Sequence, residues 1–379
     1  MINPAKRTST IELSQIRKMF EVTNPNAINL GIGEPDFDVP ENIKLAMEQS
    51  IKNNETHYTP NKGYIELREA ITQKFKKDNN INTNPENIIV TAGASEALYM
   101  CAQAFIEKND EVILPDPSFL SYEACIKLAD GKVVGVNCEM ENEFKLKAED
   151  VQEKINKNTK AVILNSPSNP TGAVMDKEDI KAIADLSMDH DFLIISDEIY
   201  EKIIYDKKHY SPAAYSDNVI TINGFSKTYA MTGWRLGYIA ADKKLMDIML
   251  TMHTYCSTCS PTFLQIGLAE SIDSERTKND VDCMVEIFER RRKLAINMLK
   301  RCANLKFSIP YGAFYILLDV SDTGMDGTTF ARRLLDEKHV ALVSADSMGS
   351  GCKNIVRMSY ACSENVIKEG MDRLYDFVS

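Results

Sequence analysis

Seven apolar runs between residues 88 and 240 constrain the fold of this chain more than any other feature. They are short, rich in β-branched residues, and separated by stretches with helical periodicity. Continuous apolar strands that alternate with helices are typical of a mostly parallel sheet buried on both faces. The expected strands are IIV (88–90), EVIL (111–114), KVVGV (132–136), KAVILN (160–165), FLIIS (192–196), VITI (219–222) and LGYIA (236–240). We therefore predict an α/β fold whose large domain contains a seven-stranded sheet.

The link between the last two runs, residues 223–235, is too short for a full crossover helix, so we expect at least one antiparallel neighbour. A charged helical pattern over 273–303 then predicts a long helix that leads to a second, smaller α/β unit. Its expected elements are strands in GAFYILLD (312–319), HVALV (339–343) and NIVRMSY (354–360), and helices around 327–337 and 363–378.

Composition and charge narrow the class of protein. The chain has 379 residues, of which 44% are hydrophobic and 26% charged, as in ordinary globular proteins. A formal net charge of −11 argues against nonspecific nucleic-acid binding. We find no apolar run of about 18 residues and no signal-peptide pattern, so we expect neither membrane insertion nor export. Nine scattered cysteines, an odd number, suit a reducing compartment, and we predict a cytoplasmic protein.

One cluster, His253-x-x-Cys256-x-x-Cys259, has a spacing that zinc sites use. A closed zinc site needs a fourth ligand, however, and the segment continues into SPTFLQIGLAE, which is typical of a buried helix. We therefore predict no metal here and favour small residues in a loop that lines a pocket or an interface.

The segment NGFSKTYAMTGWRLGY (223–238) contains the best candidate for a covalent cofactor anchor. Asn223-Gly224 breaks an expected strand, so Lys227 emerges at a strand end, where α/β proteins bind ligands. Arg235 follows and can return a bidentate cation to the same pocket to hold a phosphate. Taken alone, such a lysine is most often a solvated side chain.

Two other expected strands end in groups that suit ligand binding. Asp197 follows FLIIS, where a buried carboxylate needs a partner, and Tyr200 lies three residues on, on the same face. The loop TAGAS (91–95) precedes an expected helix, so its free N–H groups and the positive helix end suit an anion. Helix capping by Asp197 or Ser95 is the alternative interpretation.

These segments and several others, in this order, resemble the class I and II aminotransferase family, whose members are pyridoxal phosphate (PLP) enzymes of fold type I. A single motif would be weak support, but the ordered set covers nearly the whole chain. The motifs are NLGIGEPDFDVP (29–40), HYTPNKGYIELREAI (57–71), VTAGASEAL (90–98), DPSFLSY (116–122), NSPSNPTGAV (165–174), ISDEIYE (195–201), the lysine segment, YGAFYILLD (311–319) and VRMSYACSEN (356–365). The resemblance implies a large PLP-binding domain over 52–285 and a small discontinuous domain made of 1–51 and 286–379.

The resemblance also assigns roles to single residues. Lys227 would anchor the cofactor and act as general base, Asp197 would pair with the pyridine nitrogen, and Tyr200 would bind the phenolic oxygen. The rest of the implied cofactor site comprises Gly93, Ala94, Ser95, Phe119, Asn169, Ser226, Arg235 and Tyr58. The implied substrate site comprises Gly33, Ile32, Asn169 and Arg357, with Arg357 as the clamp on the α-carboxylate.

The implied activity is ping-pong transfer of an amino group between an L-amino acid and a 2-oxo acid such as 2-oxoglutarate. Tyr58 would reach the phosphate of the neighbouring subunit, which implies a homodimer with shared active sites. SQIRKMF, PSFLSY and TYCSTCSPTF are most similar to archaeal-type aromatic aminotransferases, so aromatic amino acids are the first expected substrates. Aspartate comes second, because Lys62 or Arg17 could bind a distal carboxylate. VSADSMG (343–349) departs from the proline-glycine turn of the family.

Other functions stay open at this point. A PLP lyase or decarboxylase would use the same residues and would differ in its products. A noncatalytic regulator of this fold would carry an added DNA-binding domain, whereas the resemblance begins by about residue 11. A nicotinamide dehydrogenase would need a third glycine in GIGEPDF (31–37) and an opening helix after it.

Overall fold

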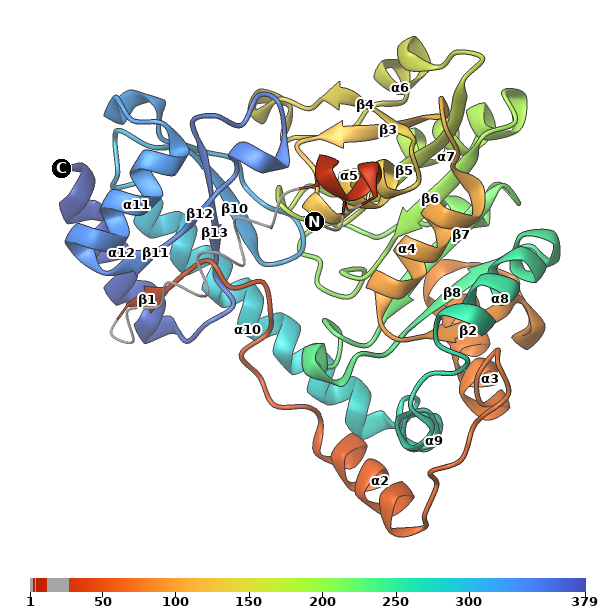
Figure 1. Ribbon diagram of the computed structural model, residues 1–379. Coiled ribbons are helices and arrows are strands. Elements are labelled where there is room, and N and C mark those ends of the chain that lie inside the picture. The colour runs from red at the N-terminus through yellow and green to blue at the C-terminus, as the bar shows by residue number, and fades with distance from the viewer. Residues whose placement is uncertain (1–2, 4, 12–26) are drawn as a thin grey trace.

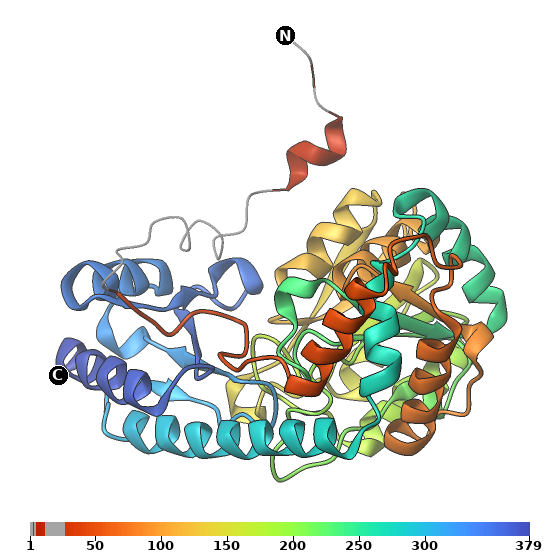
Figure 2. The same ribbon diagram turned by 90° about the horizontal axis from the view of Figure 1, so that it is seen from below.

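The computed structural model describes residues 3, 5–11 and 27–379. Its main sheets have seven and four strands. Figures 1 and 2 show the two sheets in separate units that lie side by side, with helix α10 (Glu275–Leu299) running along both. The prediction of a large sheet plus a smaller α/β unit is therefore confirmed.

The large sheet contains all seven predicted runs, in the order β2-β8-β7-β6-β5-β3-β4. Strand β8 is antiparallel to both of its neighbours, as the short link predicted, and the other adjacent pairs are parallel. The strands are β2 (Ile88–Thr91), β3 (Glu111–Asp116), β4 (Lys132–Asn137), β5 (Thr159–Asn165), β6 (Leu193–Asp197), β7 (Val219–Gly224) and β8 (Gly237–Ala241).

Helices cover both faces of this sheet because its strands are apolar on both sides. In β5, Val162 and Leu164 join one apolar core, whereas Ala161 and Ile163 join the other. Side chains alternate along a strand, so a continuous apolar run needs cover on two faces. One face is covered by α6 (Ala148–Lys154) and α7 (Lys177–Asp189), and the other by α4 (Ala94–Phe105), α5 (Leu120–Leu128) and α8 (Lys243–Cys256).

A third core forms beside β2 and β8, at one edge of the sheet. It is built with α2 (Glu41–Lys52), α3 (Ile65–Lys74) and α9 (Thr262–Ser271). The prediction of a loop around His253 is wrong for His253 and Cys256, because both residues lie in the last turns of α8. His253 is fully buried there, and its Nδ1 atom is 3.0 Å from Oε1 of Glu96.

The smaller unit contains a sheet in the order β12-β13-β10-β9 and a separate parallel pair, β1 with β11. HVALV (339–343) was expected to be one strand, and this is wrong. Its first half pairs with β1 and its second half pairs with β13, so the strand divides at Leu342. The elements are β1 (Ile28–Asn29), β9 (Lys306–Phe307), β10 (Tyr315–Asp319), β11 (Val340–Ala341), β12 (Val343–Ser344), β13 (Ile355–Ser359), α11 (Gly327–Lys338) and α12 (Glu364–Val378).

Helix α10 also holds the segment that follows β1. Its Arg291 makes a bidentate ion pair with Asp36, at 2.5 and 3.0 Å. The predicted domain boundary at 285–286 falls inside this helix and stays a prediction. No helix within residues 3, 5–11 and 27–379 has the length and apolar character needed to cross a membrane.

Candidate active site

Lys227 lies on the loop after β7, at the carboxyl edge of the parallel strands. Its Nζ atom donates a hydrogen bond to the carbonyl of Gly33, at 2.5 Å, from a segment 194 residues away in the chain. The rings of Tyr200 and Phe314 each lie 5.9 Å from Nζ. The predicted anchor and the predicted substrate loop therefore meet in one crevice.

Burial lowers the pKa of Lys227 to about 8. The Glu34 carboxylate opposes this shift, and the positive charges of Arg357 and Arg235 add to it. A lysine with this pKa is partly neutral near neutral pH, and only the neutral amine can attack a carbonyl or take a proton.

Asp197 is the last residue of β6, and its side chain is buried. Its Oδ2 atom accepts a hydrogen bond from the Tyr122 hydroxyl at 2.8 Å, and Oδ1 accepts one from the backbone N–H of Ile199 at 3.2 Å. Burial raises the pKa of Asp197 to about 6, although both hydrogen bonds favour the charged form. Above this pKa the carboxyl is ionised, and its charge can stabilise a buried positive group beside it.

Tyr200 follows on the turn after β6, and its hydroxyl lies 2.9 Å from the hydroxyl of Tyr315. The two rings meet edge to face. A Cβ atom at Gly33 would lie 2.6 Å from the same Tyr315 hydroxyl. Tyr315 thus explains why a glycine is needed where the substrate loop crosses the crevice.

The loop before α4 has the shape of an anion cradle. Gly93 caps this helix with a φ of 80°, a conformation that favours glycine. A Cβ there would lie 2.6 Å from Nη2 of Arg235, so the guanidinium rests against the loop, as predicted for a phosphate site. Ala94 and Ser95 begin the helix, where backbone N–H groups have no intrahelical acceptor.

Arg357 in β13 is 2% exposed, and its two hydrogen-bond partners are neutral. Nη1 donates to Oδ1 of Asn169 at 2.8 Å, and Nη2 donates to the carbonyl of Gly31 at 3.0 Å. Within the described residues no carboxylate forms an ion pair with Arg357, and its Nε atom has no partner. A buried cation without an anion is costly, so the site suits a carboxylate ligand.

The remaining predicted residues divide into two groups. Ser226 is buried beside Lys227, Ile32 is half-buried beside Gly33, and Phe119 caps α5, with its ring 5.7 Å from that of Tyr122. Tyr58 differs, because it is 85% exposed on the loop between α2 and α3.

The two residues proposed for a distal carboxylate have different outcomes. The Lys62 ammonium is engaged with Glu86, donating to the carbonyl at 2.9 Å and to Oε2 at 3.0 Å. Arg17 lies outside the described residues. The VSADSMG departure also has a structural setting, because the carbonyl of Met348 accepts a hydrogen bond from Ser118 at 2.8 Å.

Three functional contacts were not predicted from the sequence. Tyr122 and Tyr315 lie inside motifs that were singled out, DPSFLSY and YGAFYILLD, but their partners are 75 and 115 residues away. Asn165 donates from Nδ2 to the carbonyl of Asp197 at 2.9 Å, across neighbouring strands. Strand order explains only the Asn165 contact, since Tyr122 lies in α5 and Tyr315 lies in β10 of the other sheet.

Comparison with known proteins identifies the family of this chain. Residues 25–374 match the aminotransferase class I and II family. The chain is 44% identical to a probable aspartate aminotransferase of Methanocaldococcus jannaschii, over 97% of each chain. It is 40% identical to aromatic-amino-acid aminotransferase 2 of Thermococcus litoralis, over 97% of this chain and 96% of that one.

A solved structure agrees with these sequence matches. The aspartate aminotransferase of Thermus thermophilus with maleate superposes with a TM-score of 0.95, at 36% identity, over 99% of this chain and 100% of that one. The chain belongs to the class I and II aminotransferase family, whose members depend on PLP, and it is an aminotransferase.

Proposed function

We propose that this aminotransferase holds PLP on Lys227 and holds the α-carboxylate of its amino-acid substrate on Arg357. The observation that carries the proposal is the neutral environment of the buried Arg357 guanidinium. It donates to an amide and a carbonyl oxygen and forms no ion pair with a carboxylate of the described part of the chain. Both classes of substrate, amino acids and 2-oxo acids, have an α-carboxylate that supplies the missing anion.

The residues present fit the cofactor. The Gly93 loop and Arg235 suit its phosphate, the buried Asp197 carboxyl suits its pyridine nitrogen, and the Lys227 amine suits its aldehyde. When bound, the cofactor supplies an electron sink for the bond broken at the substrate Cα atom.

The protein's own groups position the substrate and move the proton. Arg357 and Asn169 fix the α-carboxylate, and the 31–34 segment covers the substrate from the other side. Lys227, with its lowered pKa, can take the Cα proton as a neutral amine and can later donate that proton from its ammonium form. The Tyr200 hydroxyl lies 2.9 Å from that of Tyr315 and would hold the phenolic oxygen of the cofactor.

We infer that aromatic amino acids are the preferred donors, with 2-oxoglutarate as acceptor. Support comes from Lys62, whose ammonium is already engaged with Glu86 and is not free for a distal carboxylate. Aspartate is the second candidate, because a relative 44% identical to this chain is named a probable aspartate aminotransferase.

We also infer a homodimer with shared active sites. The support is Tyr58, a large aromatic side chain that is 85% exposed. The loop that carries it is joined to the first turn of α9, because Thr262 Oγ1 donates to the carbonyl of His57 at 2.5 Å. All nine cysteines are unpaired, which supports a reducing compartment such as the cytoplasm.

The test is an absorbance spectrum of the purified protein with PLP, before and after single amino acids are added without any acceptor. We expect a visible band that is lost with the true donors, with release of the matching 2-oxo acid. Release of carbon dioxide or ammonia instead would indicate the decarboxylase or lyase alternative.

Lys227→Ala should abolish the visible band and nearly all turnover. The matched control is Lys243→Ala, which removes an exposed ammonium paired with Asp247 and should leave both unchanged. Turnover at the normal rate in Lys227→Ala would contradict the proposal.

A further inference from the structure

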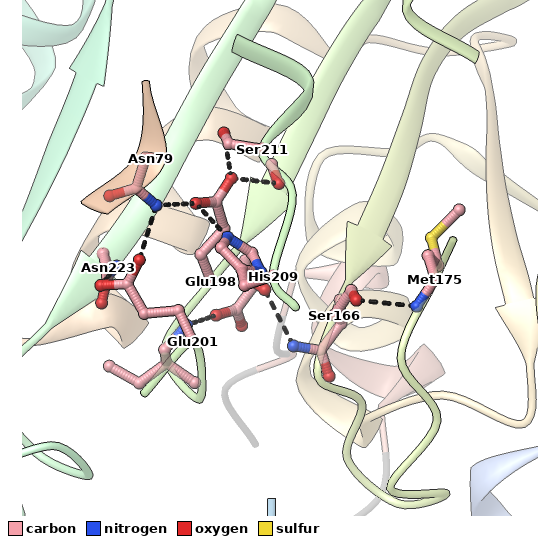
Figure 3. Close-up of polar contacts among 12 residues, drawn as sticks. Asn79, Ser166, Met175, Glu198, Glu201, His209, Ser211 and Asn223 are labelled. Atoms are coloured by element: carbon pink, nitrogen blue, oxygen red, sulfur yellow. Dashed lines mark hydrogen bonds and ion pairs between the residues drawn. The ribbon is translucent and has the colours of Figure 1, made fainter. Parts of the chain in front are cut away.

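A buried polar cluster lies behind the turn that presents Asp197 and Tyr200. It contains Glu198 and Glu201, which are 1% and 6% exposed, and His209. Figure 3 shows these three side chains gathered beside Asn79, Ser211 and Asn223. One ligand atom from each of Glu198, Glu201 and His209 lies within 4.8 Å of the others, a spacing that could hold a metal ion.

Both oxygens of Glu198 already have hydrogen-bond donors. Its Oε1 atom accepts from the hydroxyls of Ser196, at 2.9 Å, and Ser211, at 2.5 Å. Its Oε2 atom lies 2.9 Å from Nε2 of His209 and accepts from Nδ2 of Asn79 at 3.2 Å. A metal ion would have to displace these contacts.

Glu201 is satisfied in the same way and has a cation of its own. It accepts from Asn79 at 2.6 Å and from Asn223 at 2.8 Å, and it makes an ion pair with Lys74. Burial favours the neutral acid, but Lys74 and His209 outweigh it and lower the pKa of Glu201 to about 2. Lys74 therefore supplies positive charge that a metal ion would bring, and the cluster is an ion-pair network.

His209 is the second basic group of the cluster. Burial of its ring opposes ionisation, and so does the Lys74 ammonium, but Glu198 and Glu201 outweigh both and raise the pKa of His209 above its ordinary value. Each carboxylate is thus balanced by a basic partner, Lys74 for Glu201 and His209 for Glu198. This balance matters at Asp197, because the Glu198 charge also acts on Asp197 and favours its neutral form.

The network joins distant parts of the chain to one short turn. Lys74 and Asn79 come from the end of α3 and the helical turn after it, and Asn223 comes from β7. His209 comes from the segment between the turn and β7. On the turn itself, positions 198 and 201 point into the network, whereas 197 and 200 contact the groups of the crevice. The back of the turn is thus fixed by the network.

We propose that Glu198 and His209 form a positioning ion pair for the active site. The pair holds the turn that presents Asp197 and Tyr200, and the imidazolium cancels the carboxylate charge behind Asp197. The proposal rests on the proposed function for the roles of Asp197 and Tyr200, and it adds two residues that touch neither substrate nor cofactor.

The pair makes opposite predictions for its two single variants. His209→Asn leaves the Glu198 charge uncompensated, which should raise the pH at which the visible band of the PLP-loaded protein titrates. Glu198→Gln removes that charge and should lower it. We expect shifts on the order of 0.5–1 pH unit. The double variant carries neither charge and should titrate close to the wild-type pH.

The experiment is an absorbance titration of the four proteins, with thermal unfolding measured in parallel. His190→Asn, an exposed histidine at the end of α7, is the control and should change nothing. Lower unfolding temperatures with the band still titrating at the wild-type pH would mean a purely structural role and overturn the proposal. If His209→Asn does not fold, His209→Gln takes its place with the same expected result.

A second readout separates this proposal from the proposed function. NMR titration of His209 in the cofactor-free protein should show a pKa above the ordinary value that falls in Glu198→Gln. A wild-type protein with no visible band would refute the cofactor proposal. The titration of the His209 imidazole would still test whether Glu198 and His209 form an ion pair. An imidazole that titrates at its ordinary pKa, or a zinc ion bound only when Glu198 is present, would overturn the pair.

Discussion

At the scale of single residues, the crevice is marked by charges that lack counterions. Lys227, Asp197 and Arg357 each hydrogen-bond to neutral groups, and none of them forms an ion pair within the described part of the chain. Buried charges elsewhere in proteins are normally paired, as Glu201 and Lys74 are here. Two basic groups and one acid without an ion-pair partner match a cofactor with a cationic ring and a substrate with a carboxylate.

The first prediction concerns the acid. Tyr122→Phe removes the hydroxyl that favours the charged form of Asp197, so the pKa of Asp197 should rise above about 6. Because burial already raises this pKa, the folded protein prefers the neutral acid, and the resulting stability is lost as the pH rises through about 6. The variant should therefore lose about 1–3 kcal/mol of unfolding free energy at pH 8, and less at pH 5.

Urea unfolding of the cofactor-free protein at several pH values measures this difference. Tyr99→Phe, on the exposed side of α4, serves as the control and should show no loss at any pH. A loss that is the same at pH 5 and pH 8 would mean that the hydroxyl does not act through the ionisation of Asp197.

At the scale of elements, the sequence predicted what depends on local pattern. The seven strands were found because each is a continuous apolar run, and Gly93 and Lys227 were placed at strand ends because loops follow those runs directly. The division of HVALV was not predictable, because it depends on two partner strands from distant parts of the chain. The network around Glu198 was missed for the same reason, since its donors outside the turn come from three separate segments, 74–79, 209–211 and β7.

The second prediction concerns how α8 supports the anion loop before α4. Glu96 accepts from the backbone N–H of Ala92 at 2.5 Å and contacts His253 of α8 at 3.0 Å. Glu96→Ala leaves both groups without this partner, which should cost about 1–3 kcal/mol of stability and weaken PLP binding about tenfold. Binding is measured by fluorescence titration of cofactor-free protein. The control is Glu107→Ala, exposed just beyond the other end of α4, and unchanged affinity in Glu96→Ala would contradict this support.

At the scale of the whole molecule, the described surface carries two unusually exposed aromatic residues close to one another in the fold. Tyr58 is 85% exposed and Tyr255 is 88% exposed. The loop that carries Tyr58 is tied to the last turn of α8, which carries Tyr255, because Asn61 Nδ2 donates to Thr254 Oγ1 at 3.2 Å. Large aromatic side chains are enriched in protein interfaces, where burial recovers the free energy lost by their exposure to water. This face of the molecule is therefore where we expect the second subunit to bind.

The last prediction tests whether the sites are shared across that interface. A Lys227→Ala subunit has no anchor but an intact Tyr58, and a Tyr58→Ala subunit has the reverse. If Tyr58 serves the neighbouring site, a mixed dimer contains one complete site and one doubly defective site. Co-expression with two tags and purification of mixed dimers should then recover about half of the wild-type activity at limiting PLP.

The alternative makes a different prediction for the same protein. If Tyr58 serves its own subunit, each site of the mixed dimer keeps one defect, and activity stays at the level of the Tyr58→Ala homodimer or below. Mixing the two purified homodimers briefly, before subunits exchange, gives the baseline without any shared site. Recovery above that baseline requires the Tyr58 hydroxyl to act across the interface, because no other rearrangement of these two variants restores a complete site.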